Sequence, residues 1–190
     1  VPQFEFEVMR AAQAEGVDGG EDIAHATQAV AMMPGSGEYA LATSPVRFDY
    51  GAGNAALANV NTPAGKPDFT VATERLQTEL PNLKASSLIV SWFGNDLRCG
   101  ECEIKPKVEQ VEHDADMSWS VSGVSRAQAE PVPRDVTDRP VYGGTPTDAS
   151  VIEAIEHMNE QGIDVLYYPF ILMDQLGDNV LPDPYSGDVG

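Results

Sequence analysis

The sequence predicts an α/β fold that contains a parallel sheet. Two apolar runs, 87–93 and 163–173, are typical of strands that are covered on both faces. Ahead of the second run, residues 145–148 (Thr-Pro-Thr-Asp) carry the capping groups of a helix start, and Gly162 is placed to close that helix. With a short strand over 140–143 before it, this order of strand, helix and strand predicts a βαβ unit, whose strands are parallel.

The N-terminal part of the chain predicts a mixture of short elements. Residues 3–9 alternate between apolar and acidic side chains, which is the period of a half-buried strand. Over 23–33, apolar residues recur every three or four positions ahead of Pro34, which predicts a short helix. The stretch 35–65 is rich in Gly, Pro, Asn and Ala, so we expect packing onto another segment to order it. A second helix is expected over about 70–80, because its apolar residues share one face and a proline follows.

A polar segment over 99–139 interrupts the apolar pattern. It contains strand-like residues over 101–108, an acidic turn over 112–116 and a second candidate strand around Trp119 and Val121. Because it lies between two apolar strands, we interpret this segment as an excursion from a core element.

The charge balance limits the classes of partner. The 190 residues include 30 acidic residues against 11 Lys and Arg, which gives a formal net charge of −19. Phosphate backbones and anionic headgroups are bound through clustered Lys and Arg, so no nucleic acid and no stable membrane insertion are expected. The sequence shows neither an apolar run of about 18 residues nor a secretory signal pattern. We interpret both ends of the chain as cuts through a longer polypeptide.

The two cysteines, Cys99 and Cys102, form a C-x-x-C pair. A zinc site of four ligands would need two more, and the three histidines are isolated and lack ligand-like spacing. The helix start that is typical of redox pairs is missing, since Pro106 follows closely. We therefore interpret the pair as ordinary thiols or a local disulfide, with redox or metal chemistry as the alternative.

Four blocks of the sequence carry a resemblance to a known family. They are 91–98 (SWFGNDLR), 142–150 (YGGTPTDAS), 168–174 (YPFILMD) and 181–185 (LPDPY). In this order they resemble the tail-tip hub proteins of alphaproteobacterial gene transfer agents and related siphophages, which contain the gene-transfer-agent TIM-barrel-like domain. A weaker similarity to the region before that barrel covers 76–82, and Cys99 departs from the family's pattern.

The resemblance implies a fold, a location and partners. The implied fold is an incomplete (β/α) TIM-barrel-like segment over 86–190, similar to glycoside hydrolases, preceded by a smaller mixed α+β hub or connector region over 1–85. The implied role is that of a structural component of the tail tip of a phage-like particle, within a larger hub polypeptide. Its partners would be other tail-tip proteins and copies of itself around the tail axis, with host envelope glycan as a further candidate. No cofactor is implied.

The barrel predicted in this way is incomplete. A complete (β/α)8 barrel takes about 250 residues and eight strands, whereas this sequence offers three candidate barrel strands, 87–93, 140–143 and 163–173. We therefore expect neighbouring subunits or a further part of the polypeptide to cover the open edges. The missing strands also favour a structural role over that of a working enzyme.

A glycosidase-like site would use carboxylates at the C-terminal ends of the strands. Asp174, which follows the last apolar run, is the best single catalytic candidate, and Asp96 follows the first run. Trp92, Tyr142 and Tyr168 are candidate stacking surfaces for a glycan. The alternative function is therefore a glycoside-hydrolase-like domain that cleaves or binds host envelope glycans. The structural alternative is that Asp174 caps a loop and the aromatic side chains fill the core.

An oxygen-rich loop near the C-terminus is a candidate metal site. Its side-chain ligands would be Asp174, Asp178, Asn179 and Asp183. Carboxylate and carbonyl oxygens suit Ca²⁺, but the spacing does not match the EF-hand loop, and such clusters are usually turns. On the predicted helix before this loop, Glu153 and His157 lie four residues apart and are interpreted as a solvated face.

Overall fold

The computed structural model describes residues 23–33, 35–174 and 180–188, so the strand predicted over 3–9 lies outside the described residues. The elements in chain order are α1 (Ile23–Ala26), β1 (Ala29–Met32), β2 (Arg47–Asp49), β3 (Ala55–Leu57), α2 (Asp68–Glu79), β4 (Ala85–Gly94), β5 (Ile104–Lys105), β6 (Lys107–Val108), β7 (Ser120–Val121), β8 (Val124–Ser125), the 3₁₀ turn η1 (Arg126–Gln128), β9 (Glu130–Pro131), α3 (Asp148–Glu160) and β10 (Asp164–Met173). None of the described helices has the length and apolar character needed to cross a membrane.

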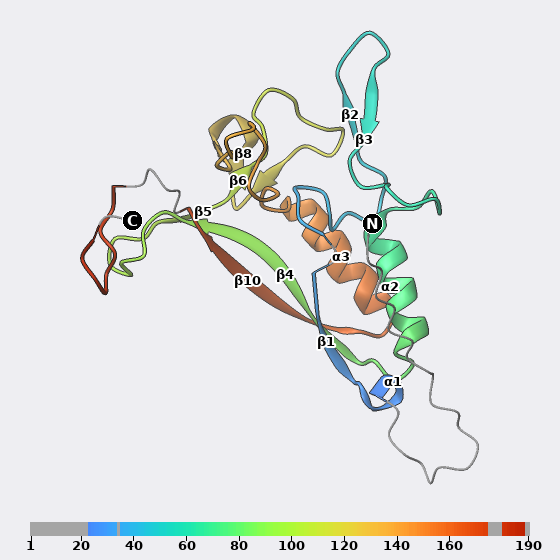
Figure 1. The fold of residues 1–190 in the computed structure, drawn as a ribbon. Helices are drawn as coiled ribbons and strands as arrows, with labels where there is room; N and C mark the ends of the chain where they lie inside the picture. The colour runs from blue at the N-terminus through green and yellow to red at the C-terminus, as the bar shows by residue number, and fades with distance from the viewer. Residues whose placement is uncertain (1–22, 34, 175–179, 189–190) are drawn as a thin grey trace, which may run out of the picture.

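A parallel sheet with the strand order β1-β4-β10 organises the chain (Figure 1). β10 pairs with β4 along its whole length, from Asp164 opposite Ala85 to Met173 opposite Gly94, whereas β1 pairs only with the first part of β4. The helix α2 connects β1 to β4, and α3 connects β4 to β10, so the sheet consists of two consecutive βαβ units. The predicted α/β fold with a parallel sheet is confirmed, and no closed barrel forms among the described residues.

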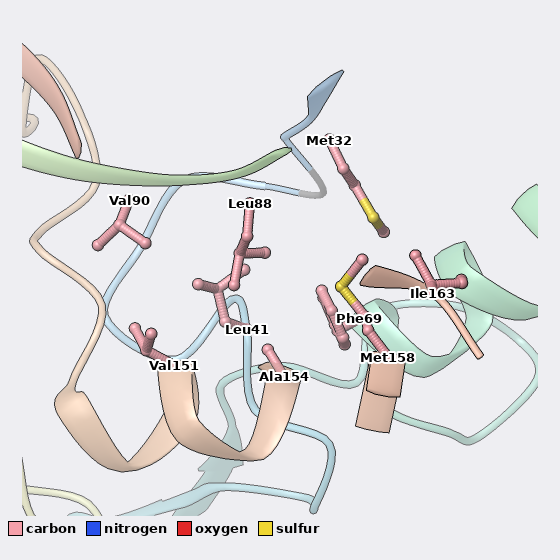
Figure 2. Close-up of a cluster of buried hydrophobic side chains, with 9 residues drawn as sticks. All are labelled: Met32, Leu41, Phe69, Leu88, Val90, Val151, Ala154, Met158 and Ile163. Carbon is pink, nitrogen blue, oxygen red and sulfur yellow. The ribbon is translucent and has the colours of Figure 1, made fainter. Parts of the chain in front are cut away.

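Both crossover helices pack on the same face of the sheet. The core between these helices and the sheet contains Met32, Leu41, Phe69, Leu88, Val90, Val151, Ala154, Met158 and Ile163. Figure 2 shows Val151 and Ala154 of α3 facing Leu88 and Val90 of β4, with Leu41 between them. Leu88 and Ala154 are fully buried. This core positions the C-terminal half of β4 and of β10 beyond the helices, where the two strands continue as a ribbon (Figure 1).

A second core lies beneath the polar excursion. Its buried residues are Tyr39, Ala42, Val46, Val108, Ala115, Trp119 and Val121. The indole of Trp119 is 1% exposed, and its Nε1 donates a hydrogen bond to the Thr145 carbonyl oxygen at 2.8 Å. The stretch 35–65 thus packs against residues more than 60 positions further along the chain, as expected of a segment with little core of its own.

The termini of α3 follow part of the predicted pattern. Gly162 closes the helix with a φ of +76°, a conformation that glycine adopts without strain. The start differs, because the N-cap position is Thr147 and the helix begins at Asp148. The Thr147 hydroxyl does not cap the helix but exchanges hydrogen bonds with the backbone of Ser120, both at 3.1 Å. This helix start is therefore also an anchor for the excursion.

Two predicted elements are wrong. The helix predicted over 23–33 ends at Ala26, and the following residues form β1, because their backbone pairs with β4. The strand predicted over 140–143 makes only an isolated antiparallel bridge between Pro140 and Arg134. The strand that precedes α3 in the βαβ unit is therefore β4, and the excursion lies within that connection.

Candidate functional site

Among the described elements, β10 carries the largest group of exposed large apolar side chains. We call it the β10 surface; it consists of Leu166, Tyr167, Tyr168, Ile171 and Met173, which are 37 to 63% exposed. The strand has ten residues, and none of those between Asp164 and Asp174 is charged. Neighbours along a strand point to opposite faces, so the β10 surface covers both faces of the ribbon.

The outer edge of β10 presents unpaired backbone groups. The amides of Asp164 and Asp174 donate to Lys84 and Gly94, so even-numbered amides of this strand point toward β4. Odd-numbered amides therefore point to the outer edge, where no strand pairs with β10 in the described part of the chain. Pro169 occupies one of these outward positions, so its missing amide hydrogen removes no hydrogen bond to β4.

Asp174, the predicted catalytic candidate, is held by an ion pair. It follows β10, and its carboxylate contacts the Nζ of Lys107, which also lies 3.4 Å from a carboxylate oxygen of Glu130. The side chains of Lys107 and Asp174 are only 10% and 14% exposed. This arrangement joins the end of β10 to the excursion and leaves Asp174 with a neutralised charge.

The three predicted stacking residues do not form one surface. Trp92 is half-buried between the two cores, and its Nε1 donates to the Tyr167 hydroxyl at 3.1 Å. Trp92 lies opposite Ile171, whereas Tyr168 lies opposite Ile89, so Trp92 and Tyr168 point to opposite faces of the ribbon. Tyr142 lies in the segment before α3, where its hydroxyl donates to the Met33 sulfur at 3.6 Å.

The predicted loop ligands and cysteines show turn geometry. Asp183 accepts backbone hydrogen bonds from Ser186 and Tyr185, which lower its pKa, and Asp178 lies outside the described residues. No group of three or more His, Cys, Asp or Glu suited to a metal ion occurs among the residues whose structure is described. Cys99 is exposed, Cys102 is half-buried, and both are free thiols.

Asp96 is also part of a turn. Its carboxylate accepts hydrogen bonds from the backbone amide and the guanidinium of Arg98, with a closest distance of 2.6 Å. These hydrogen bonds lower the pKa of the Asp96 carboxyl. Asp96 therefore fixes the chain direction after β4.

A cluster that the sequence analysis missed lies at the second core. The guanidinium of Arg126 contacts the Glu38 carboxylate at 2.5 Å, Asp114 at 3.0 Å and the Tyr39 hydroxyl at 2.9 Å. Glu38 also accepts the backbone amide of Glu109 at 2.6 Å. Glu38 and Tyr39 lie about 75 residues or more before Asp114 and Arg126 in the chain, so no local sequence signal indicates the cluster.

A cavity of about 480 Å³ adjoins this cluster. It lies between the segment 35–40, the β2–β3 hairpin with the turn that follows it, and the residues Glu109 and Gln110. Burial, together with the negative charge of Glu38, raises the pKa of the Glu109 carboxyl above its ordinary range.

Comparison with known proteins does not identify a family, so the class of this protein is defined by its fold. A scan against models of protein families finds no match, and a search of curated proteins finds none either. The structure defines a mixed α/β protein with a three-stranded parallel sheet, two crossover helices on one face and an outer strand, β10, whose outer edge pairs with none of the described strands.

Proposed function

We propose that this chain is a structural component of the tail tip of a phage or phage-like particle, within a hub that surrounds the tail axis. The observation that carries the proposal is the β10 surface, which is apolar on both faces and, within the described ranges of the chain, unpaired at its outer edge. A long, uncharged edge strand is a template for pairing with another polypeptide, and proteins that stay monomeric usually protect such edges. This surface is suited to permanent assembly.

The winding of the sheet supports the same proposal. The three parallel strands lie side by side in the same order in which they occur along the chain, β1-β4-β10, and both crossover helices lie on one face. This is the arrangement of a (β/α) barrel, whereas a doubly wound sheet carries helices on both faces. It agrees with the resemblance of the four sequence blocks to the TIM-barrel-like domain of tail-tip hub proteins. In the proposed hub, a further strand pairs with the outer edge of β10.

The geometry favours assembly over glycan hydrolysis. A glycosidase needs two carboxyl groups placed on either side of the scissile bond. Asp174 instead forms a nearly buried ion pair with Lys107, and the aromatic candidates Trp92 and Tyr168 lie on opposite faces. We therefore propose a structural role for the end of β10.

Immunogold labelling of purified tailed particles tests the location. Antibodies raised against this 190-residue chain are applied to particles from the source organism and imaged by electron microscopy. We expect gold at the tip of the tail. Labelling of the capsid, or of no particle component, would overturn the proposal.

A second experiment tests the surface itself. The double variant L166K/I171K places two charges on the β10 surface, and we expect it to lose association with the other tail proteins in co-sedimentation. The matched control is V136K/I152K, which changes two exposed apolar residues away from β10. Equal association of both variants would show that β10 is not the assembly surface.

A further inference from the structure

The cavity beside the buried cluster is lined by acidic residues. Its walls include the carboxylates of Glu38, Asp68 and Glu109, and no Lys, Arg or His lines it among the described residues. Glu38 is compensated by Arg126. Asp68 instead accepts two hydrogen bonds from Asn61, whose backbone amide and side-chain amide are both neutral donors.

Glu109 is the central carboxylate of this cavity. Its Oε1 accepts the Gly144 amide at a long 3.4 Å, and the same oxygen lies against Gly37. Glu109 and Ser36 also line a second, adjoining hollow of about 380 Å³, so Glu109 borders both hollows. The cavity thus has a half-buried Glu109 carboxyl group in its wall, and the ion pair of the neighbouring Glu38 with Arg126 leaves Glu109 without an ion pair of its own among the described residues.

Aromatic rings form another wall. Phe48 and Tyr50 stack with ring centroids 6.0 Å apart and an interplanar angle of 13°, and both line the cavity. Tyr39 packs against Phe48 edge-on, with centroids 5.6 Å apart. Aromatic faces attract cations, most strongly where water is partly excluded. Carboxylates and aromatic rings around one cavity are the groups that recognise an ammonium ion attached to an apolar stem.

We propose that this cavity binds an alkylammonium group, with Glu109 as its charge partner and the Phe48–Tyr50 stack as its apolar and cation-binding wall. The volume of about 480 Å³ accommodates a small aliphatic amine or the side chain of a lysine. The inference is independent of the tail-tip role and of the β10 surface, because it depends on different residues.

The binding depends on pH through Glu109. The charged and titratable groups around the site among the described residues are Glu38 and Arg126 from the buried cluster, Asp68 in the cavity wall, Tyr142 in the adjoining hollow, Arg134, whose guanidinium donates to the Glu109 carbonyl oxygen, and His113, whose ring packs edge-on against Tyr50. Only the ionised carboxylate pairs with an ammonium ion. The affinity therefore rises as the pH passes upward through the raised pKa of Glu109 and falls below it.

Chemical-shift titration of the isotope-labelled chain tests the proposal. The probe is butylammonium chloride. The neutral comparison is n-butanol, and sodium chloride controls for the added salt. We expect butylammonium to shift the amides of Gly37, Tyr39 and Gln110, and butanol at the same concentration to bind at least about tenfold more weakly. Equal effects of the amine and the alcohol would overturn the proposal.

Three variants separate the site from the overall charge of −19. E109Q removes the charge partner, and we expect it to weaken butylammonium binding about tenfold. E156Q makes the same charge change on an exposed residue of α3 and should bind like the wild type. Y50L removes an aromatic face and should weaken binding severalfold. Equal affinities of E109Q and E156Q would show that the amine responds only to the net charge. A titration with Nα-acetyl-lysine methylamide then distinguishes the source: binding as tight as that of butylammonium supports a lysine side chain as the ligand, whereas much weaker binding supports a free small amine.

Discussion

Arg126 and Glu38, 88 residues apart in the sequence, form a nearly buried ion pair at 2.5 Å that joins the excursion to the segment after β1. The two side chains are 5% and 3% exposed. Although burial disfavours the charged guanidinium, the hydrogen bonds and charge of Glu38 hold the pKa of Arg126 above its usual range. The pair fixes the position of the second core, because Tyr39 and Asp114 use the same guanidinium.

Replacing Arg126 by Met should destabilise the fold strongly. The substitution leaves Glu38 buried without its positive partner, which typically costs about 3 to 5 kcal/mol. Urea denaturation at neutral pH measures this loss as a change in the free energy of unfolding. The double variant R126M/E38L removes the isolated charge and should recover most of the loss.

An exposed ion pair provides the control for this prediction. Lys66 contacts Glu74 at 2.6 Å, but their side chains are 53% and 48% exposed. We expect K66M to change the free energy of unfolding by less than about 1 kcal/mol, because solvent screens the pair. If R126M cost no more than K66M, the buried pair would have no special role in stability.

Replacing Glu109 by Gln should stabilise the protein at neutral pH. Burial and the charge of Glu38 raise the pKa of Glu109 in the folded state, so the folded state binds its proton more tightly than the unfolded chain does. This contribution to stability is fully present below the unfolded pKa of about 4.3 and is lost as the pH rises through the folded pKa. The advantage of E109Q should therefore appear at pH 7 and vanish near pH 4, as measured by urea denaturation at both values. A constant difference between the two pH values would contradict the raised pKa.

Replacing Asp174 by Asn should reduce stability. Among the described residues, Lys107, whose side chain is 10% exposed, would keep only the more distant Glu130 as a charged partner, and we expect a cost of about 2 to 3 kcal/mol. D188N, a change on an exposed residue, provides the control in thermal or urea unfolding. An unchanged stability of D174N, together with a measurable glycan-cleaving activity of the wild type that D174N lacks, would favour the hydrolase alternative.

The sequence predicts the long elements better than the short ones. The strands β4 and β10 and the helices α2 and α3 each extend over ten residues or more, so their apolar patterns are unambiguous. β1 has four residues, and its spacing also fits a helix; only pairing with the edge of β4 decides its conformation. This pairing joins residues more than 50 positions apart and leaves no local pattern.

The candidate site was harder to predict than the fold. The prediction that Glu153 and His157 form a solvated face is wrong, because Glu153 accepts the Thr43 amide at 2.8 Å and His157 lies 3.0 Å from the Thr73 hydroxyl. The Glu38–Arg126 pair and the Glu109 cavity depend on the packing of loops that are distant in the chain. The sequence shows which residues are charged, but it does not show which of them meet in the folded structure.

Replacing Gly143 by Ala should disrupt both the fold and the cavity. A Cβ on Gly143 would lie 2.3 Å from the backbone nitrogen of Gly37, so the glycine is needed for the close approach of the two segments. Backbone cannot yield as a flexible side chain does, and the segment carrying Glu38 must move away. We expect a cost of at least about 3 kcal/mol, comparable with severe overpacking.

Gly51 provides the matched control for this prediction. It has a φ of +81° with open space around its Cβ position, so G51A meets only backbone strain of about 1 kcal/mol. The free energies of unfolding of the two variants, together with the amide shifts of residues around Glu109, distinguish close approach from simple loss of flexibility. If G143A and G51A cost the same and the Glu109 region kept its shifts, the contact between Gly143 and Gly37 would not hold this part of the structure together.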